Sequence, residues 1–289
     1  MDNYRTSSLF HFTNKKNNLK NILKEGIKPN YAKETFLDKS VIGIPMISMC
    51  DIPISRTKTI QRYGSYAIGF TKEWGFRNGF NPIHYIQGKH FETVHNNFIE
   101  LNTNLHNKIS EHFNEKENST FIPTLITQPE NNDSYLFYRT YNLYLSSLSY
   151  SKPYYGKNKK GKIVINYDEN EWRYISPVLP NKNWQKAIEE QYNPYSNPFL
   201  LTNYWLWGIE EYNKWRGDEK KTKPKSMFKS LNFLVSDISF IMLQLENQIP
   251  DMINFISKLN SLAGTLINED EKKILMSKII SFERITKDF

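Results

Sequence analysis

The sequence predicts an α+β fold: a mainly antiparallel sheet with a helical insertion and helices at the C-terminus. Three observations support this prediction. Short apolar runs follow one another in the first third of the chain, too closely spaced for the crossovers that parallel strands need. From about residue 91 to residue 113, apolar residues recur at helical spacing instead. Two more amphipathic helices are predicted at residues 249–259 and 271–280.

The chain opens with a predicted strand, a polar turn and an amphipathic helix. Residues 9–13 are strand formers with His11 at their centre. Gly26 ends the helix that follows, and Pro29 prevents its resumption. A histidine between a strand and a helix is well placed to face a ligand, although it could equally be an ordinary strand residue with a satisfied hydrogen bond. The buried face of the helix is predicted from three residues at i, i+3 and i+4 spacing: Leu19, Ile22 and Leu23.

Further strands are predicted at residues 41–50, 63–70 and 81–86. The first ends in a polar turn, where Asp51 and Ser55 are both suited to cap a helix. Thr71 is expected to cap a short turn after the second strand.

The middle of the chain is predicted to hold helices and basic loops. Residues 91–113 and 135–148 form a helical insertion, and a short strand at 163–165 and an extended stretch at 167–175 follow. Residues 151–162 are expected to be a lysine-rich loop because they contain Pro153, Gly156 and Gly161. A second basic loop is predicted at 214–229, and a buried strand unit at 231–243.

A proline cluster near Pro180 divides the chain into two predicted regions. Residues 1–180 form the core, with the helical insertion at about 90–150. Residues 181–289 hold an aromatic- and lysine-rich segment and the C-terminal helices, which are expected to pack on the core.

Composition narrows the class of protein. The formal charge of +8 suits an acidic partner such as nucleic acid, but it also suits a lysine-rich surface typical of a low-GC genome. Cys50 is the only cysteine, so an internal disulfide and a cysteine-based zinc cluster are excluded. No apolar run approaches a membrane span, and no leader-like segment follows Met1, so a cytoplasmic protein is expected.

Several common catalytic motifs are absent. There is no glycine-rich phosphate loop and no His-Glu-x-x-His, and the spacing of the histidines fits no standard metal-binding helix. No metal site is therefore expected. Cys50 could act as a nucleophile with a distant histidine, but its apolar surroundings favour an inert core thiol.

The predicted extended stretch at 167–175 carries the most suggestive polar pattern. If this stretch is extended, Glu169, Glu171 and Arg173 share one face, while Trp172 and Tyr174 share the other. Two carboxylates and an arginine on one strand face could form a site. A solvent-facing ion pair is the commoner arrangement.

The layout of a His-x-Thr strand before a helix and a Glu-x-Glu on a late strand resembles the ADP-ribosyltransferase fold. In that fold, a first-strand histidine or arginine and a late-strand glutamate flank bound NAD. The resemblance implies that His11 and Thr13 hold the nicotinamide-side ribose and that Glu171 is the catalytic residue, with Glu169 beside it. Cleavage of the nicotinamide–ribose bond builds positive charge on the ribose, which a carboxylate stabilises.

The same resemblance implies NAD as the cofactor and extends the cofactor-binding set. Three residues join it: Asp51, Ser55 and Tyr66. Arg5 or Arg56 could contact a phosphate or ribose, but nothing in their spacing selects either.

A second resemblance covers nearly the whole chain. The sequence is similar to the AbiGi family of abortive phage-resistance proteins, described as the antitoxin of a two-component module. The matching segments begin with Leu9 to Thr13, the helix up to Gly26, Ile44 to Pro53 and Tyr63 to Gly69. They continue with Lys72 to Gly75, Asn81-Pro82, Glu171 to Tyr174, Asp237-Ile238, Ile249-Pro250, Ile279 to Ser281 and Asp288-Phe289.

Two functions are therefore expected in competition. The first is a phage-defence NAD-dependent ADP-ribosyltransferase acting on a macromolecule, with nucleic acid suggested by lysines near aromatics such as Tyr154 and Tyr155. The second is a non-catalytic antitoxin or regulator that binds DNA or a partner toxin encoded nearby. A weaker third alternative is a nucleotide sensor without turnover.

Overall fold

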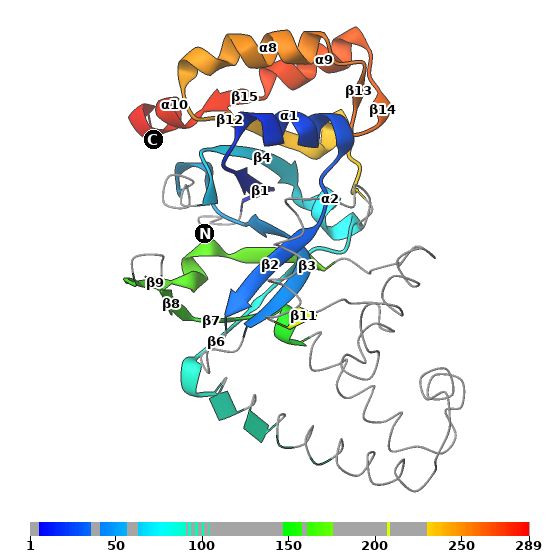
Figure 1. The fold of residues 1–289 in the computed structure, drawn as a ribbon. Coiled ribbons are helices and arrows are strands. Elements are labelled where there is room, and N and C mark those ends of the chain that lie inside the picture. The colour runs from blue at the N-terminus through cyan, green and yellow to red at the C-terminus, as the bar shows by residue number, and fades with distance from the viewer. Residues whose placement is uncertain are drawn as a thin grey trace, which may run out of the picture.

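The structure is a computed structural model of the 289-residue chain. It describes residues 6–35, 41–56, 63–90, 147–157, 161–175, 207–208 and 230–288, together with residues 92, 93, 96, 97, 100 and 104. As predicted, the fold is α+β, with one large, mainly antiparallel sheet and helices packed against it (Figure 1).

The central sheet has the strand order β15–β12–β4–β1–β3–β10–β5. Among its described strands, only β12 and β15 pair in parallel. Two further strands, β2 (Asn30–Thr35) and β11 (Trp207–Gly208), pair with the first half of β3. The bounds of the main strands are β1 (Ser8–Thr13), β3 (Val41–Cys50), β4 (Tyr66–Thr71), β5 (Asn81–Pro82), β10 (Glu171–Ile175), β12 (Ile238–Leu243) and β15 (Ile279–Ser281).

Strand β3 connects two parts of the sheet. On one side, its Cys50 lies opposite Phe10 of β1, and this is the single residue pairing between those two strands. On the other side, β3 pairs with β10 along the whole of that strand, from Glu171 to Ile175. The strand that carries the predicted histidine and the strand that carries the predicted glutamate therefore lie on either side of β3.

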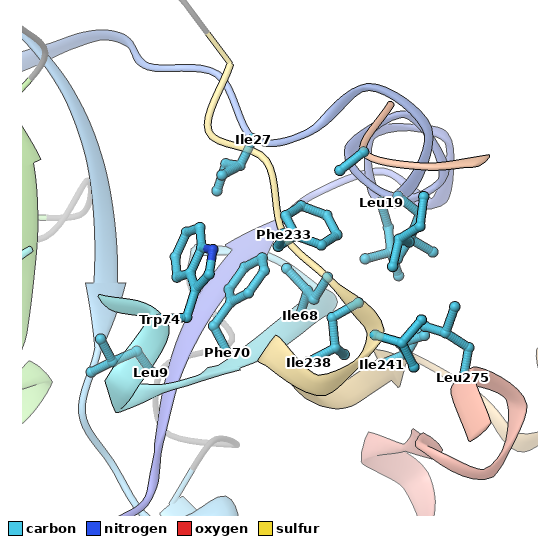
Figure 2. Packing of buried hydrophobic residues seen from close by; sticks show 14 of the residues in the cluster. Leu9, Leu19, Ile27, Ile68, Phe70, Trp74, Phe233, Ile238, Ile241 and Leu275 are labelled. Atoms are coloured by element: carbon cyan, nitrogen blue, oxygen red, sulfur yellow. The ribbon is translucent and has the colours of Figure 1, made fainter. Parts of the chain in front are cut away.

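The two faces of the sheet hold separate hydrophobic clusters. Helices α1 (Lys16–Glu25), α8 (Ile249–Ser257) and α9 (Glu269–Ser277) cover one face (Figure 1). There Leu19 of α1 and Leu275 of α9 pack with the strand residues Ile68 and Ile241, as Figure 2 shows. Helix α10 (Phe282–Asp288) packs on the other face. The cluster on that face includes Phe10, Cys50, Ala67, Met242 and Phe282.

Helix α2 (Lys72–Arg77) places a tryptophan at the centre of the first cluster. Thr71 caps the helix, its hydroxyl accepting a hydrogen bond from the backbone N–H of Trp74 at 3.2 Å. The Trp74 ring stacks on Phe70 with a centroid distance of 4.2 Å, and its Nε1 donates to the carbonyl of Asn232 at 3.0 Å (Figure 2). A Cβ at Gly75 would lie 2.6 Å from Leu9 Cδ1, so a larger residue there would force the Leu9 side chain to shift.

The predicted first strand and helix are confirmed as β1 and α1. Gly26 ends the helix with a φ of 81°, and its N–H donates to the carbonyl of Ile22 at 2.9 Å. The prediction at 41–50 is also confirmed, as β3, whereas the stretch predicted at 167–175 becomes a strand only from Glu171, as β10. The strand predicted at 63–70 begins only at Tyr66. The one predicted at 81–86 is interrupted at Ile83, giving β5 and β6 (His84–Ile86).

The loop predicted at 151–162 is wrong, because this segment contains two strands. β7 (Ser151–Pro153) pairs in parallel with β6, and β8 (Tyr155–Lys157) pairs with β9 (Ile163–Ile165). Pro153 is the last residue of the short strand β7, where a missing backbone N–H is tolerated. A Cβ at Gly156 would lie 2.7 Å from the side-chain amide of Asn166, so a larger residue there would force that side chain to shift.

The C-terminal segment contains more elements than predicted. Helix α9 begins at Glu269, set by a capping box between Asn268 and Glu271, and ends at Ser277. β15 and α10 follow it. The strand predicted at 231–243 starts only at Ile238, after a 3-10 turn at Val235–Asp237. A second 3-10 turn (Glu246–Gln248) and a hairpin of β13 (Ser261–Leu262) and β14 (Thr265–Leu266) complete the segment.

Some predictions fall outside the described residues. These are the second basic loop at 214–229 and most of the helical insertion at 91–113 and 135–148. Strands from both sides of Pro180, β10 and β12, belong to the same sheet. None of the described helices is long and apolar enough to cross a membrane.

Replacing Trp74 by alanine is expected to lower the free energy of unfolding by about 3–5 kcal/mol, because it removes a fully buried ring from the first cluster. The matched control is Phe76→Ala in the same helix, whose side chain is 63% exposed and which should cost less than about 1 kcal/mol. Urea unfolding followed by circular dichroism measures both. Equal losses would contradict the packing described here.

Candidate functional site

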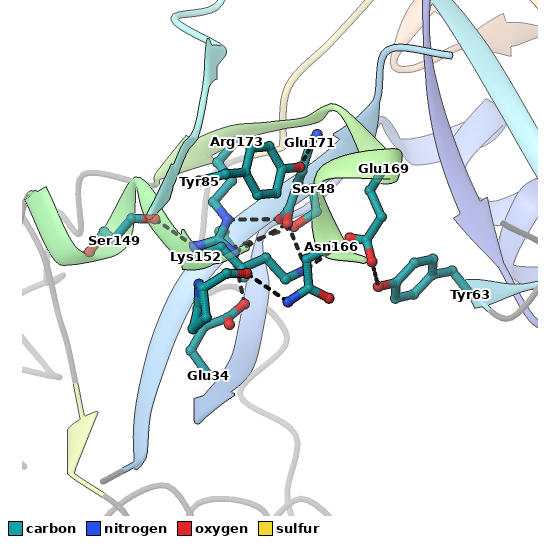
Figure 3. Close-up of polar contacts among 12 residues, drawn as sticks. Glu34, Ser48, Tyr63, Tyr85, Ser149, Lys152, Asn166, Glu169, Glu171 and Arg173 are labelled. Atoms are coloured by element: carbon teal, nitrogen blue, oxygen red, sulfur yellow. Dashed lines mark hydrogen bonds and ion pairs between the residues drawn. The ribbon is translucent and has the colours of Figure 1, made fainter. Parts of the chain in front are cut away.

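The β10 strand positions a buried charged side chain directly beside β3. Arg173 lies opposite Ser48 of β3 and is completely buried. Its Nε donates to Glu171 Oε1 at 2.7 Å, its Nη1 donates to the carbonyl of Ser149 at 2.7 Å, and its Nη2 donates to Glu34 Oε1 at 2.9 Å (Figure 3). The guanidinium thus joins β10 to β2 and to the segment before β7.

A lysine completes this group from the other side. Lys152 of β7 donates to Glu171 Oε2 at 3.0 Å and to Glu169 Oε2 at 2.8 Å, so it bridges the two carboxylates (Figure 3). Glu169 also accepts a hydrogen bond from the Tyr63 hydroxyl at 2.5 Å. We call this set the β10 charge cluster: Glu34, Lys152, Glu169, Glu171 and Arg173.

The electrostatics of the cluster keep Glu171 ionised. Burial alone would raise the pKa of Glu171, but the charges of Arg173 and Lys152 outweigh burial and lower it to about 2. Burial opposes the charge of Lys152 as well, but the carboxylates raise the pKa of Lys152 well above its ordinary value. For Glu34 burial prevails, and its pKa is raised despite Arg173. Three carboxylates surround two cations here, so a raised pKa at one carboxylate is physically reasonable.

The structure only partly confirms the predicted strand face. Glu171 and Arg173 do share one face of β10, and they form an ion pair there. Glu169 lies instead in the 3-10 turn at Asn166–Glu169 that precedes the strand. Asn170 has a left-handed backbone with φ of 42°, which reverses the chain between the two glutamates. Lys152 can therefore reach both carboxylates, although only one of them belongs to the strand.

His11 and Thr13 lie where β1 and β3 separate. His11 Nδ1 is 3.0 Å from the carbonyl oxygen of Ser48, which can only accept, so Nδ1 carries the proton. Burial lowers the pKa of His11, and the hydrogen bond to Ser48 only partly offsets this effect. The imidazole is therefore neutral at pH 7, with Nε2 as an acceptor. Thr13 accepts a hydrogen bond from Asn18 of α1 at 3.1 Å.

The strand pairings place His11 and Glu171 on different faces of the sheet. His11 lies opposite Ile68, which belongs to the cluster under α1. Glu171 lies opposite Cys50, which belongs to the cluster under α10. A turn at Tyr63 and Gly64 connects the two regions. A Cβ on Gly64 would come within 2.2 Å of the Thr13 carbonyl oxygen, and the neighbouring Tyr63 reaches Glu169.

The other predicted cofactor-binding residues are dispersed. Asp51 pairs with Lys72 at 2.7 Å, although its backbone N–H donates to the carbonyl of Asn170, close to the charge cluster. Ser55 is exposed in a short 3-10 turn. The Tyr66 hydroxyl accepts a hydrogen bond from Gln248 at 3.0 Å, in the cluster under α1. Arg56 is exposed, and Arg5 lies outside the described residues.

Sequence reasoning missed four members of this region. Lys152 was assigned to a basic loop, and Glu34, Tyr63 and Tyr85 were not singled out. The Tyr85 oxygen accepts a hydrogen bond from the backbone N–H of Glu171 at 2.7 Å, and burial raises the pKa of Tyr85. No local pattern marks these residues, because each meets β10 from a distant part of the chain. Among the described residues, no group of three or more His, Cys, Asp or Glu side chains could hold a metal ion.

Replacing Glu171 by glutamine is expected to lower the free energy of unfolding by about 3 kcal/mol at pH 7, because two buried cations lose a carboxylate. The loss should depend on pH. A folded pKa of about 2 against an ordinary value of 4.5 means that the carboxylate stabilises the fold above pH 4.5. That contribution is lost as the pH falls from 4.5 toward 2.

Denaturant unfolding of both proteins across this pH range provides the measurement. The difference between wild type and Glu171→Gln should shrink steadily below pH 4.5. A difference that stays constant with pH would show that the Glu171 charge contributes nothing to stability.

Comparison with known proteins assigns the family. The family described as "Putative abortive phage resistance protein AbiGi, antitoxin" matches residues 16–244, well over half of the chain. "Abortive phage resistance protein AbiGi" of Lactococcus lactis subsp. cremoris is 26% identical over 265 residues, which cover 85% of this chain and 89% of that protein. No solved structure matches, so the ADP-ribosyltransferase-like core stays a prediction. The predicted second resemblance is confirmed: the chain belongs to the AbiGi family of abortive phage-resistance proteins.

Proposed function

We propose that this AbiGi chain acts in phage defence as an NAD-dependent ADP-ribosyltransferase that modifies a macromolecule. One observation carries the proposal: β1 and β10 lie on either side of β3, and the Tyr63–Gly64 turn joins the end of β1 to the Glu169 carboxylate. Thr13 at the end of the first strand and Glu169 before the late strand, far apart in sequence, are thus connected through this turn, while His11 and Glu171 lie on different faces of the sheet.

The chemistry of these residues fits NAD. Bound NAD supplies the nicotinamide–ribose bond, whose cleavage builds positive charge on the ribose. Glu171 is held ionised, and the cluster carries three carboxylates against two cations, so negative charge is in place to stabilise that ribose. A neutral His11 with Nε2 as acceptor suits a ribose hydroxyl, and the Thr13 hydroxyl can still donate.

For NAD to bind at Glu169 and Glu171, a side chain that now contacts them must move. Glu169 and Glu171 are only 2% and 5% exposed, and side chains of the protein already occupy both. NAD can reach them only if Tyr63 or Lys152 releases its carboxylate oxygen. Tyr63 is 42% exposed, so its ring lies at the rim of the cluster and can be displaced without opening the core.

Nicotinamide release from NAD by the purified chain tests the proposal, with and without DNA, RNA and cell lysate. Glu171→Gln is expected to reduce release by about a hundredfold or more, because it removes the charge that stabilises the ribose. The matched control is Glu34→Gln, which perturbs the same cluster through Arg173 but leaves the Glu169–Glu171 pair intact and should retain most activity.

Both variants are assayed at a temperature at which circular dichroism shows them folded. A folded wild-type chain that releases no nicotinamide under any of these conditions contradicts the proposal. Equal losses in Glu171→Gln and Glu34→Gln would instead assign Glu171 a structural role.

A second candidate function is a non-catalytic antitoxin that binds a partner toxin. The observation in its favour is that both oxygens of Glu171 and both oxygens of Glu169 already have protein partners, as in a structural ion-pair network. The description of the family as an antitoxin agrees with this candidate.

Expression in bacteria separates the two candidates. An antitoxin should be harmless alone and should rescue growth from a toxin encoded by the adjacent gene, with wild type and folded Glu171→Gln equally effective. A catalytic effector should inhibit growth by itself, and Glu171→Gln should abolish that inhibition. Colony counts after induction provide the measurement.

A further inference from the structure

We infer that the β8–β9 hairpin binds single-stranded nucleic acid through a face of tyrosine and isoleucine side chains. Tyr155 lies opposite Ile165, and Ile163 lies two residues before Ile165 on the same strand, so the side chains of these three residues share one face of the hairpin. This face is exposed: Tyr155 is 56%, Ile163 66% and Ile165 40% accessible. Exposed apolar side chains gathered on one small hairpin mark a binding surface.

The aromatic surface continues from the hairpin to the charge cluster. Tyr155 packs edge-on against Tyr154 at 4.9 Å, and Tyr154 stacks on Tyr167 at 5.5 Å with nearly parallel rings. Tyr167, itself half exposed, packs edge-on against Tyr85 at 5.3 Å. The Tyr85 oxygen in turn accepts the hydrogen bond from the Glu171 backbone. Four tyrosine rings, each in contact with the next, therefore connect the surface to the predicted catalytic residue.

The charge of this segment selects an acidic partner. Residues 151–167 contain five lysines and no acidic residue. Lys152 is bound to the two glutamates, and the other four lysines belong to the hairpin and its connection. Phosphates provide the matching negative charge at regular spacing.

The rings indicate which nucleic acid fits. Tyrosine side chains stack on bases, and only the bases of a single strand are free to stack on a protein surface. In a duplex the base faces are covered by their neighbours, so it could use the lysines but not the tyrosines. The bound strand would be the macromolecule that is modified, and this role rests on the proposed function. The binding itself does not.

Fluorescence anisotropy with labelled oligonucleotides of mixed sequence tests the inference without NAD. The full-length chain should bind single-stranded DNA or RNA more tightly than duplex DNA, at about 50 mM salt. Tyr155→Ala should weaken single-strand binding by about fivefold or more, because a stacked base loses its partner. Phe76→Ala removes an exposed aromatic ring of α2, outside the hairpin, and should have no effect.

The lysines provide a second, independent readout. Lys162→Glu should weaken binding and reduce its salt dependence, whereas Lys273→Glu on α9 makes the same charge change away from the hairpin and should do neither. Absent binding, equal affinity for duplex, or an unchanged Tyr155→Ala would overturn the inference. Capture of a partner protein that is lost in Tyr155→Ala but kept in Phe76→Ala would also overturn it, since the hairpin would then be a protein interface. Binding without nicotinamide release would uphold this inference and contradict only the proposed function.

Discussion

The completely buried guanidinium of Arg173 is the constraint on which this region of the fold depends. A buried cation is stable only when carboxylates and carbonyls replace the water that it has lost. Its partners come from three separate places: Glu171 in the same strand, Glu34 in β2 and the carbonyl of Ser149. One side chain therefore fixes how β2 and the segment before β7 meet β10. That segment then brings Lys152 to the remaining carboxylate oxygens, so the candidate site exists because the ion pair must be satisfied.

A second constraint acts where the sheet changes partners. β1 shares a single residue pairing with β3, between Phe10 and Cys50, whereas β4 pairs with all of β1 and β10 pairs with the second half of β3. Beyond that pairing, His11 takes up a carbonyl group of β3 that β1 no longer satisfies. Because Gly64 has no side chain, the turn before β4 can pass close to the backbone of Thr13. Where the two strands separate, the His11 side chain thus takes the place of a backbone partner.

The sequence predicts the local parts of this arrangement and misses the distant ones. The β1–α1 unit follows from apolar spacing and from the conformation that Gly26 allows, and the shared face of Glu171 and Arg173 follows from strand alternation. The ion pair between Arg173 and Glu34 joins residues 139 positions apart, and no local pattern encodes it. Lys152 was hidden because proline and glycine suggested a loop. Asp51, which looked like a helix cap, is instead paired with Lys72.

Structural support and the proposed catalysis would make opposite demands on the two glutamates, which are both buried but differ in their partners. Glu171 is bound on both oxygens by the cations that support the fold, so displacing its partners costs stability. One oxygen of Glu169 is bound by Tyr63, which is 42% exposed. A ligand entering from the Tyr63 side would therefore meet the Tyr63 ring before either glutamate. Replacing that one hydrogen bond leaves Arg173 with all its partners. If Glu169 exchanged its Tyr63 partner for a ligand, Glu171 would continue to hold the sheet together, so a structural ion-pair network and a binding site are compatible within the same five residues.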